Sequence, residues 1–253
     1  MSWYGNQHVV VTGGGSGIGA AIAEDLSATG ATVTIMGRGE ERLKSKAEKI
    51  SANYEVCDVT DREQVVAAFS AAIEKSGPVT ILVNNAGVAE AMPFGKMSDE
   101  FWDRLIAVNL DGVRNCTRQV VDEMLEAGSG RIVNVASTAA LKGYSYISAY
   151  CAAKHAVVGL TRSLALEFAG RGVTVNAVCP GYTNTDIVDN ALEKIMSATG
   201  RSRDEAMAEI VKANPQGRLV EPDEVASTVR WLCDENSMSI TGQAIAIAGG
   251  EVM

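Results

Sequence analysis

The sequence is poor in histidine and has no clustered cysteines. Of its 253 residues only His8 and His155 are histidines, and they are not placed to form a ligand cluster. The five cysteines are odd in number, lie far apart and include no Cys-x-x-Cys pair; they are Cys57, Cys116, Cys151, Cys179 and Cys233. Most of them fall within apolar runs, which is typical of small core residues in a reducing compartment. We therefore expect neither a disulfide framework nor a metal site.

The sequence also lacks long hydrophobic runs and an excess of positive charge. No apolar stretch approaches the ~20 residues that span a bilayer, and the polar segment 1–7 with the short run Val9–Val11 does not resemble a signal peptide. Lysine and arginine number 22 against 31 aspartates and glutamates, a net charge of −9, which disfavours nucleic-acid binding on electrostatic grounds. We expect a cytoplasmic protein with neither a nucleic acid nor a membrane as partner.

What the sequence does contain is a regular alternation of short apolar runs and helical patterns. With 47% hydrophobic and 21% charged residues, the chain can bury a sizeable core in one large α/β domain. Strands are expected at Val9–Val11, Ala31–Met36, Tyr54–Cys57, Val79–Val83, Arg131–Val135, Val173–Val178 and Gln243–Ala248. Helical spacing between them predicts one dinucleotide-binding domain over 1–253, a doubly wound, seven-stranded parallel sheet with helices on both faces.

One segment breaks this alternation. Between Tyr182 and Val220, two short helical runs at about 185–199 and 202–213 replace the single helix expected before the next strand. Insertions at the carboxyl end of a strand are where ligand-covering segments occur in such folds. We expect 182–220 to form a small helical substrate lid within the domain.

The first strand leads into a glycine-rich loop. The loop reads Thr12-Gly-Gly-Gly-Ser-Gly-Ile-Gly19, and apolar residues then recur at helical spacing until Gly30. A strand, a glycine loop and a helix in this order allow a pyrophosphate to approach the helix N-terminus closely. The spacing differs from the common G-x-G-x-x-G, because three residues separate Gly13 from Gly17. A plain βα turn is the alternative, but it does not require so many glycines.

The end of the second strand bears on the choice of cofactor. An acidic residue there would bind the ribose 2′-hydroxyl of NAD, but Gly37 offers no side chain, and Arg38 suits a 2′-phosphate. NADP(H) is therefore favoured, while NAD(H) stays possible because Glu40 and Glu41 could pair with Arg38 instead. Asp58, with Val59, is placed for adenine contact, or else simply begins the following helix.

A tyrosine and a lysine lie four residues apart at Tyr150 and Lys154. In a helix this spacing puts both side chains on one face, where the ammonium should lower the pKa of the phenol and ready it for proton transfer. The alternative is a half-buried tyrosine beside a solvated lysine. Asn109 lies within a helical pattern at a cost in propensity, so it either faces water or has a specific role.

These motifs together resemble the short-chain dehydrogenase/reductase family over essentially the whole chain. The resemblance rests on the segment 12–19, Asn84-Asn85-Ala86-Gly87, Asn109, Ser137, Tyr150, Lys154 and Pro180-Gly181, in order and spacing. It implies that Tyr150 exchanges a proton with the substrate and that Ser137 binds the substrate oxygen. Lys154 would bind the nicotinamide ribose and lower the Tyr150 pKa, and Asn109 would hold a water that relays protons to Lys154.

The resemblance also implies a set of cofactor contacts, a strand order of 3-2-1-4-5-6-7 and a homotetramer. The expected cofactor-binding residues are Gly13, Ser16, Gly17, Ile18, Gly19, Arg38, Asp58, Val59, Asn85, Ala86, Gly87, Tyr150, Lys154, Pro180, Gly181, Thr183 and Thr185. In the tetramer, the helices that contain Asn109 and Tyr150 would pack between subunits. For Asn84 and Asn85, a structural role in holding neighbouring loops is an equally good interpretation.

Within the family, the sequence is most similar to ketoreductases that act on acetoacetyl-CoA, other 3-oxoacyl thioesters and polyketide chains. One departure is the segment 126–131, which lacks the basic residue that acyl-carrier-protein-dependent members tend to carry, although Arg171 persists nearby. This shifts the expectation mildly toward a CoA thioester or a free ketone. The expected substrate-contacting residues are Ser137, Thr138, Tyr144, Tyr182 and Met196, although Tyr144 and Met196 could also simply pack.

Two other functions compete with an NADP(H)-dependent ketone reductase. One is an NAD-dependent dehydrogenase of a cyclic or aryl secondary alcohol. The other is a catalytically silent dinucleotide-binding protein, which the intact set of Asn109, Ser137, Tyr150 and Lys154 disfavours.

Overall fold

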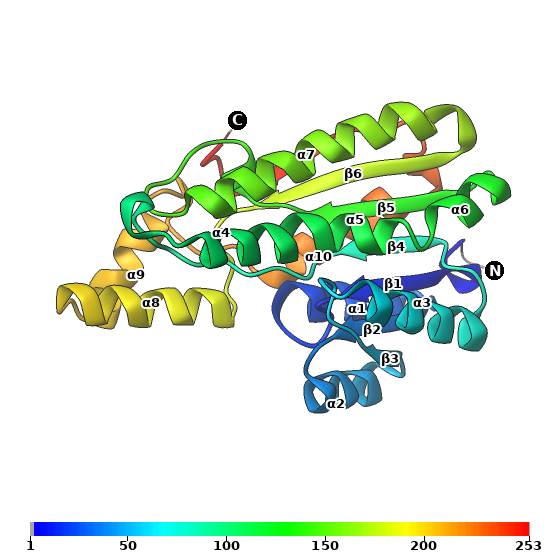
Figure 1. Ribbon diagram of the computed structural model, residues 1–253, viewed down its shortest axis with the longest axis horizontal. Coiled ribbons are helices and arrows are strands. Elements are labelled where there is room, and N and C mark those ends of the chain that lie inside the picture. The colour runs from blue at the N-terminus through cyan, green and yellow to red at the C-terminus, as the bar shows by residue number, and fades with distance from the viewer. Residues whose placement is uncertain (1–2, 253) are drawn as a thin grey trace.

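The structure is a computed structural model that describes residues 3–252, so residues 1, 2 and 253 of the predicted domain lie outside it. Seven parallel strands form one sheet in the order β3-β2-β1-β4-β5-β6-β7 (Figure 1), as the resemblance implied. The strands are β1 (His8–Thr12), β2 (Thr32–Gly37), β3 (Asn53–Val56), β4 (Ile81–Asn84), β5 (Gly130–Val135), β6 (Val173–Pro180) and β7 (Ala244–Ile247). The order reverses between β1 and β4, which is the place where ligands bind in doubly wound folds.

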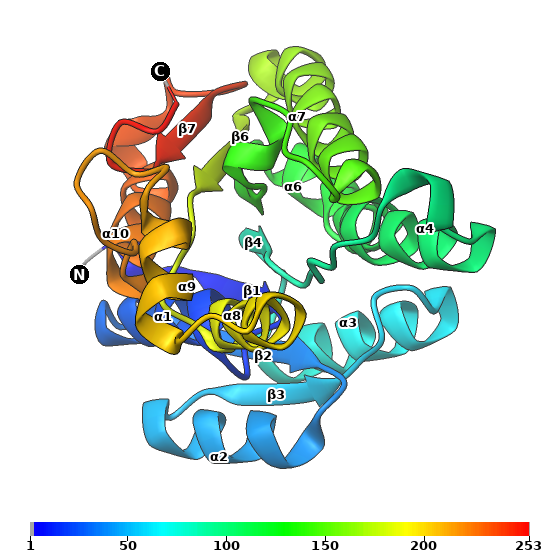
Figure 2. The same ribbon diagram turned by 90° about the vertical axis from the view of Figure 1, so that its left-hand side faces the viewer.

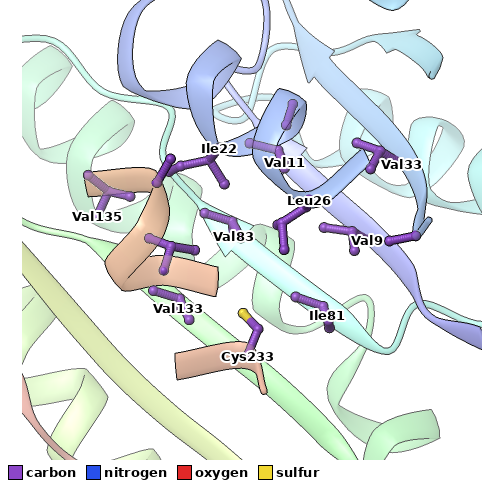
Figure 3. Close-up of a cluster of buried hydrophobic side chains, with 14 of the residues drawn as sticks. Val9, Val11, Ile22, Leu26, Val33, Ile81, Val83, Val133, Val135 and Cys233 are labelled. Carbon is purple, nitrogen blue, oxygen red and sulfur yellow. The ribbon is translucent and has the colours of Figure 1, made fainter. Parts of the chain in front are cut away.

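Helices cover both faces of the sheet (Figure 2). The helices on one face are α1 (Gly17–Ala28), α2 (Glu40–Ile50) and α10 (Pro222–Cys233). Those on the other are α3 (Arg62–Ser76), α4 (Asp99–Ile106), α5 (Gly112–Thr117), α6 (Val121–Ala127) and α7 (Ser148–Phe168). Because successive strand side chains point to opposite faces, Val9 and Val11 pack under α1 and α10, while Val10 packs with α3 and α7. Figure 3 shows the first of these two cores.

Short-range signals begin several helices. Ser98 and Asp61 cap α4 and α3 through their side-chain oxygens, and Pro222 occupies the first turn of α10, where its missing N–H is not needed. Asp58 does not begin α3, so the interpretation of Asp58 as a helix-start residue is wrong. Its Oδ1 instead accepts hydrogen bonds from the backbone and hydroxyl of Thr60.

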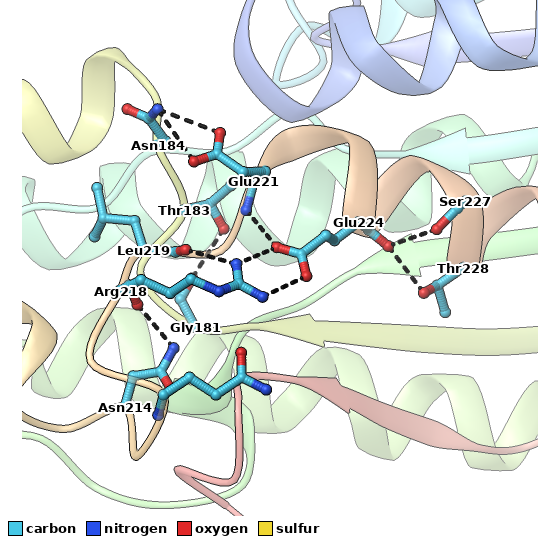
Figure 4. A network of polar contacts seen from close by, with 11 residues as sticks. Gly181, Thr183, Asn184, Asn214, Arg218, Leu219, Glu221, Glu224, Ser227 and Thr228 are labelled. Carbon is cyan, nitrogen blue, oxygen red and sulfur yellow. Dashed lines mark hydrogen bonds and ion pairs between the residues drawn. The ribbon is translucent and has the colours of Figure 1, made fainter.

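The segment 182–220 contains the two expected helices, α8 (Asp186–Thr199) and α9 (Arg203–Val211). They share a small core of their own, formed by Val188, Leu192, Ala206 and Ile210. Polar contacts hold the base of the segment (Figure 4): Arg218 forms two hydrogen bonds with the Glu224 carboxylate, and Asn184 donates to Glu221. That this segment acts as a substrate lid stays a prediction.

The structure can be compared with what the composition disfavoured: a membrane-spanning helix, disulfides and a metal site. Within residues 3–252, no helix has both the length and the hydropathy needed to cross a bilayer. The five cysteines are all free, and among the described side chains no group of three His, Cys, Asp or Glu residues is gathered to hold a metal ion.

Candidate active site

Helix α7 brings Tyr150 and Lys154 together as their spacing predicts. The Lys154 Nζ lies 5.7 Å from the centroid of the Tyr150 ring and donates a hydrogen bond to the carbonyl of Val135 at 2.9 Å. Lys154 is only 3% exposed, so the alternative of a solvated lysine is wrong. The pair therefore lies where the carboxyl end of β5 meets α7.

The expected fall in the Tyr150 pKa does not occur in this structure. Burial raises the pKa of Tyr150 to about 12, and a hydrogen bond with Ser137 acts against that rise. Burial also lowers the pKa of Lys154 to about 8. Desolvation disfavours the charged form of both groups, and Lys154 is not among the groups that shift the Tyr150 pKa. Tyr150 is therefore a protonated phenol at neutral pH.

Ser137 lies at the carboxyl end of β5, next to Tyr150. Its side chain shares the hydrogen bond with Tyr150, and its Oγ accepts from the backbone N–H of Ala139 at 3.1 Å. That second bond begins the short 3₁₀ helix Thr138–Ala140. Two hydroxyls, from Ser137 and Tyr150, are thus held side by side, as a site that polarises a carbonyl oxygen requires.

Asn109 occupies a π-helical turn, Ala107–Asp111, that connects α4 with α5. The expectation of a regular helix at Asn109 is therefore wrong. The Asn109 side-chain amide donates to the carbonyls of Leu105 and Val88 and accepts from the Val88 N–H. Asn109 is fully buried, so it does not face water. A Cβ built on Gly87 would lie 2.9 Å from Asn109 Oδ1 and 3.5 Å from Lys154 Nζ. Asn109, Gly87 and Lys154 therefore meet.

The glycine loop is shaped to admit a phosphate group. Gly13 has a φ of +66°, a conformation that other residues rarely adopt, and a Cβ on Gly19 would collide with the Asn85 amide. Ser16 is the N-cap residue of α1, but its hydroxyl caps no backbone N–H. The helix N-terminus thus keeps its own donors and a free hydroxyl beside an open backbone surface. These residues fit a pyrophosphate.

Asn85 and Thr12 hold this loop in place. The Asn85 amide donates to the carbonyls of Thr12 and Gly13, and the Thr12 hydroxyl oxygen accepts from the backbone N–H groups of Asn85 and Ala86. Asn84 donates instead to Thr117 and Asn134 on the other side of the sheet. The structural interpretation of the paired amides is therefore correct, and it places Asn85, Ala86 and Gly87 beside the loop.

The adenine end of the expected cofactor site carries an exposed positive charge. The Arg38 guanidinium lies 4.0 Å from the Asp58 carboxylate, and its side chain is 71% exposed. The partner of Arg38 is thus Asp58 rather than Glu40 or Glu41. Val59 is buried next to Asp58 and accepts a hydrogen bond from Asn115 through its carbonyl.

The residues after β6 line the opposite side of the glycine loop. Thr185 sits at the N-cap position of α8, and its methyl carbon would lie 3.2 Å from a Cβ on Gly17. Thr183 is buried and its hydroxyl donates to the Gly181 carbonyl at 3.0 Å. Pro180 ends β6 and pairs with Ile247 of β7. Of these residues, Thr185 lies next to the glycine loop, whereas Pro180, Gly181 and Thr183 make contacts within 180–183 and with β7 and the segment after it.

The expected substrate contacts divide into two groups. Thr138 follows Ser137 directly, and the Tyr144 hydroxyl lies 2.7 Å from the Thr138 hydroxyl; Tyr182 is 42% exposed beyond β6. Met196 instead packs against the small core of α8 and α9, so its interpretation as a packing residue is the better one.

An open groove of about 700 Å³ runs between the loop after β4 and α8. Val88 and Glu90 line one wall, and Ile187, Asn190 and Lys194 line the other. The sequence indicated 88–94 and 182–220 as segments that shape the substrate pocket, but it singled out none of these five residues. A helix face does not show from its own sequence which loop it will oppose.

Comparisons with known proteins agree with this geometry. A model of the short chain dehydrogenase family matches residues 7–195. A putative ketoacyl reductase of Streptomyces coelicolor is 38% identical, covering 99% of this chain and 98% of the relative. An acetoacetyl-CoA reductase of Rhizobium meliloti is 39% identical, covering 96% and 97%. The crystal structure of an actinorhodin polyketide ketoreductase with NADPH superposes with a TM-score of 0.95 at 38% identity, covering 99% of both chains.

Proposed function

The chain belongs to the short-chain dehydrogenase/reductase family, and on that premise we propose that it reduces a ketone to a secondary alcohol with NADP(H). The observation that carries this proposal is the pair of hydroxyls from Ser137 and Tyr150 beside the buried ammonium of Lys154.

The cofactor would be held along the switch point of the sheet. The glycine loop and the N-terminus of α1 would bind its pyrophosphate, and Asp58 and Val59 its adenine. Arg38 would bind the 2′-phosphate of NADP(H), since its planar guanidinium is largely exposed and Gly37, the last residue of β2, has no side chain to bind a ribose hydroxyl. Asn85, Ala86 and Gly87 would follow the ribose, and Thr185 the nicotinamide half. When bound, the reduced nicotinamide supplies the hydride.

The chain's own residues would manage the proton and the substrate oxygen. Ser137 would donate a hydrogen bond to the carbonyl oxygen and so polarise it. Tyr150 would donate the proton that converts the developing alkoxide to an alcohol. At neutral pH the Tyr150 phenol is protonated and so carries the proton that this direction of reaction needs. Lys154 would bind the ribose, and Asn109 would hold the water through which protons reach Lys154.

For the substrate we propose a 3-oxoacyl-CoA-like thioester or a small ketone. The relatives named as a ketoacyl reductase and an acetoacetyl-CoA reductase support this class. The groove beside Val88 and α8 offers room for an acyl chain. The loop before β5 has no basic residue, and Arg171 donates to the Leu125 carbonyl at 3.1 Å. Neither feature favours docking of an acidic carrier protein.

The test is a panel of acetoacetyl-CoA, ethyl acetoacetate and cyclic and aryl ketones or alcohols, each assayed with NADPH and NADH. We expect reduction of the acyl substrates with NADPH. Tyr150→Phe should abolish turnover while NADPH binding, followed by fluorescence, is retained. No turnover by the wild type across the panel would refute the proposal, and preferred oxidation of a cyclic or aryl alcohol with NAD would favour the alternative function.

We also propose that the chain assembles as a homotetramer through the helical segment that contains Asn109 and through α7. Leu166 on α7 is 84% exposed in the isolated chain, so a partner subunit that covers it would bury apolar surface. Light scattering should give about four times the mass of one chain. A Leu166→Lys variant should shift that mass downward.

A further inference from the structure

The C-terminal segment returns to the substrate side of the site (Figure 1). After β7 the chain brings Glu251 to the end of β6, where Glu251 Oε2 would lie 3.1 Å from a Cβ on Gly181. The Glu251 side chain is only 2% exposed. A carboxylate is costly to bury unless it is paired, so its partners show what holds it there.

Those partners are in the loop that follows Ser137. Glu251 Oε1 lies 3.0 Å from Lys142 Nζ and accepts a hydrogen bond from the Tyr144 hydroxyl. The Lys142 Nζ also lies 4.8 Å from the centroid of the Tyr144 ring. Glu251 therefore receives both a positive charge and a phenol proton from one short loop.

The contact continues toward the proposed reacting groups. Because a carboxylate only accepts hydrogen bonds, the Tyr144 proton is directed to Glu251, and the Tyr144 oxygen is left to accept from the Thr138 hydroxyl 2.7 Å away. Burial and the hydrogen bond to Glu251 both raise the pKa of Tyr144, which keeps that proton in place. Thr138 begins the 3₁₀ turn whose N-cap residue is Ser137.

We propose that Glu251 is a positioning residue that ties the loop 138–144 to the end of β6 and so sets the position of Ser137 and the wall of the substrate pocket. Nothing in this role requires Glu251 to touch the substrate. The inference rests on the proposed function for its catalytic consequence, but the tie itself is a property of the fold.

The test uses Glu251→Ala, Glu251→Gln and Tyr144→Phe, with Glu235→Gln as a matched control, because Glu235 is exposed and lies outside the site. In Glu251→Ala we expect the ketone KM to rise roughly tenfold while the NADPH Kd stays within about twofold, since the lost bonds lie on the substrate side. Glu251→Gln should show a smaller rise, because an amide oxygen can still accept from Tyr144.

Hydrogen exchange of the 138–146 amides provides a readout independent of turnover. It should accelerate in both Glu251 variants and in Tyr144→Phe, and not in Glu235→Gln. Should Glu251→Ala fail to fold, Glu251→Gln and Tyr144→Phe carry the test. Glu251 and Tyr144 variants that match the control in ketone KM and in exchange would overturn the proposal. If the variants exchange these amides faster than the wild type, but the wild type itself reduces no ketone, the tie is supported and the proposed function is refuted.

Discussion

The ammonium nitrogen of Lys154 lies 5.7 Å from the centroid of the Tyr150 ring while it donates a hydrogen bond to the carbonyl of Val135. Both side chains are desolvated, which raises the pKa of Tyr150 and lowers the pKa of Lys154. In each group desolvation favours the neutral form. At neutral pH Tyr150 is therefore a neutral phenol rather than a phenolate.

The first prediction concerns pH. Since burial lowers the pKa of Lys154 to about 8, its ammonium is present below that pH and is lost above it, whereas Tyr150 stays protonated to about 12. The kcat/KM for NADPH, which reports the free enzyme, should be level below pH 8 and decline above it. A Lys154→Arg variant keeps its charge, so its residual activity should lack this decline. A wild-type plateau extending to pH 10 would contradict the assignment.

The second prediction concerns stability. Because the pKa of Lys154 in the folded chain lies below its ordinary value of 10.5, the unfolded chain binds more protons between about pH 8 and 10.5. Lys154 therefore destabilises the fold at neutral pH, and this effect fades as pH rises from about 8 toward 10.5. Lys154→Met should raise the free energy of unfolding at pH 7 by about 2 kcal/mol. This figure allows for the cost of leaving the Val135 carbonyl without its hydrogen-bond donor. Urea unfolding at pH 7 and pH 10 checks this, and the gain should shrink at pH 10. Equal or lower stability at pH 7 would refute it.

The third prediction concerns cofactor choice. Arg38→Ala should lower kcat/KM for NADPH by roughly tenfold to a hundredfold and leave that for NADH within about twofold, since only the 2′-phosphate loses a charged partner. Arg62→Ala, another exposed arginine at the start of α3, is the matched control. Wild-type protein that uses NADH as efficiently as NADPH would overturn this role for Arg38.

The fourth prediction concerns Asn109. Asn109→Ala removes three hydrogen bonds and leaves the backbone groups of Val88 without their partners. We expect a loss of about 2–4 kcal/mol in the free energy of unfolding, measured by urea titration. Amide exchange at residues 87–90 should accelerate as well. Asn236→Ala, at an exposed position, should change neither. If Asn109→Ala unfolds like the wild type, Asn109 does not order this loop.

Much of the fold followed from short-range signals. The strand at Val9–Val11 and the glycine loop after it are local features, because β-branched residues favour buried strands and residues other than glycine rarely adopt the backbone conformation of Gly13. Tyr150 and Lys154 share a face because four residues make about one helical turn. Such features depend on neighbours in the chain, so the sequence alone was sufficient to predict them.

The direction of the Tyr150 pKa, the partners of Asn109 and the place of Glu251 depended on the tertiary structure. Desolvation of Tyr150 depends on what packs around α7, and that includes residues from other strands. Val88 lies 21 residues from Asn109, and Tyr144 lies 107 residues from Glu251. No local pattern records such distances. The sequence by itself determined which chemical groups the site contains, and only the packing of distant segments decided their charge states and partners, because burial and pairing are properties of the folded chain as a whole.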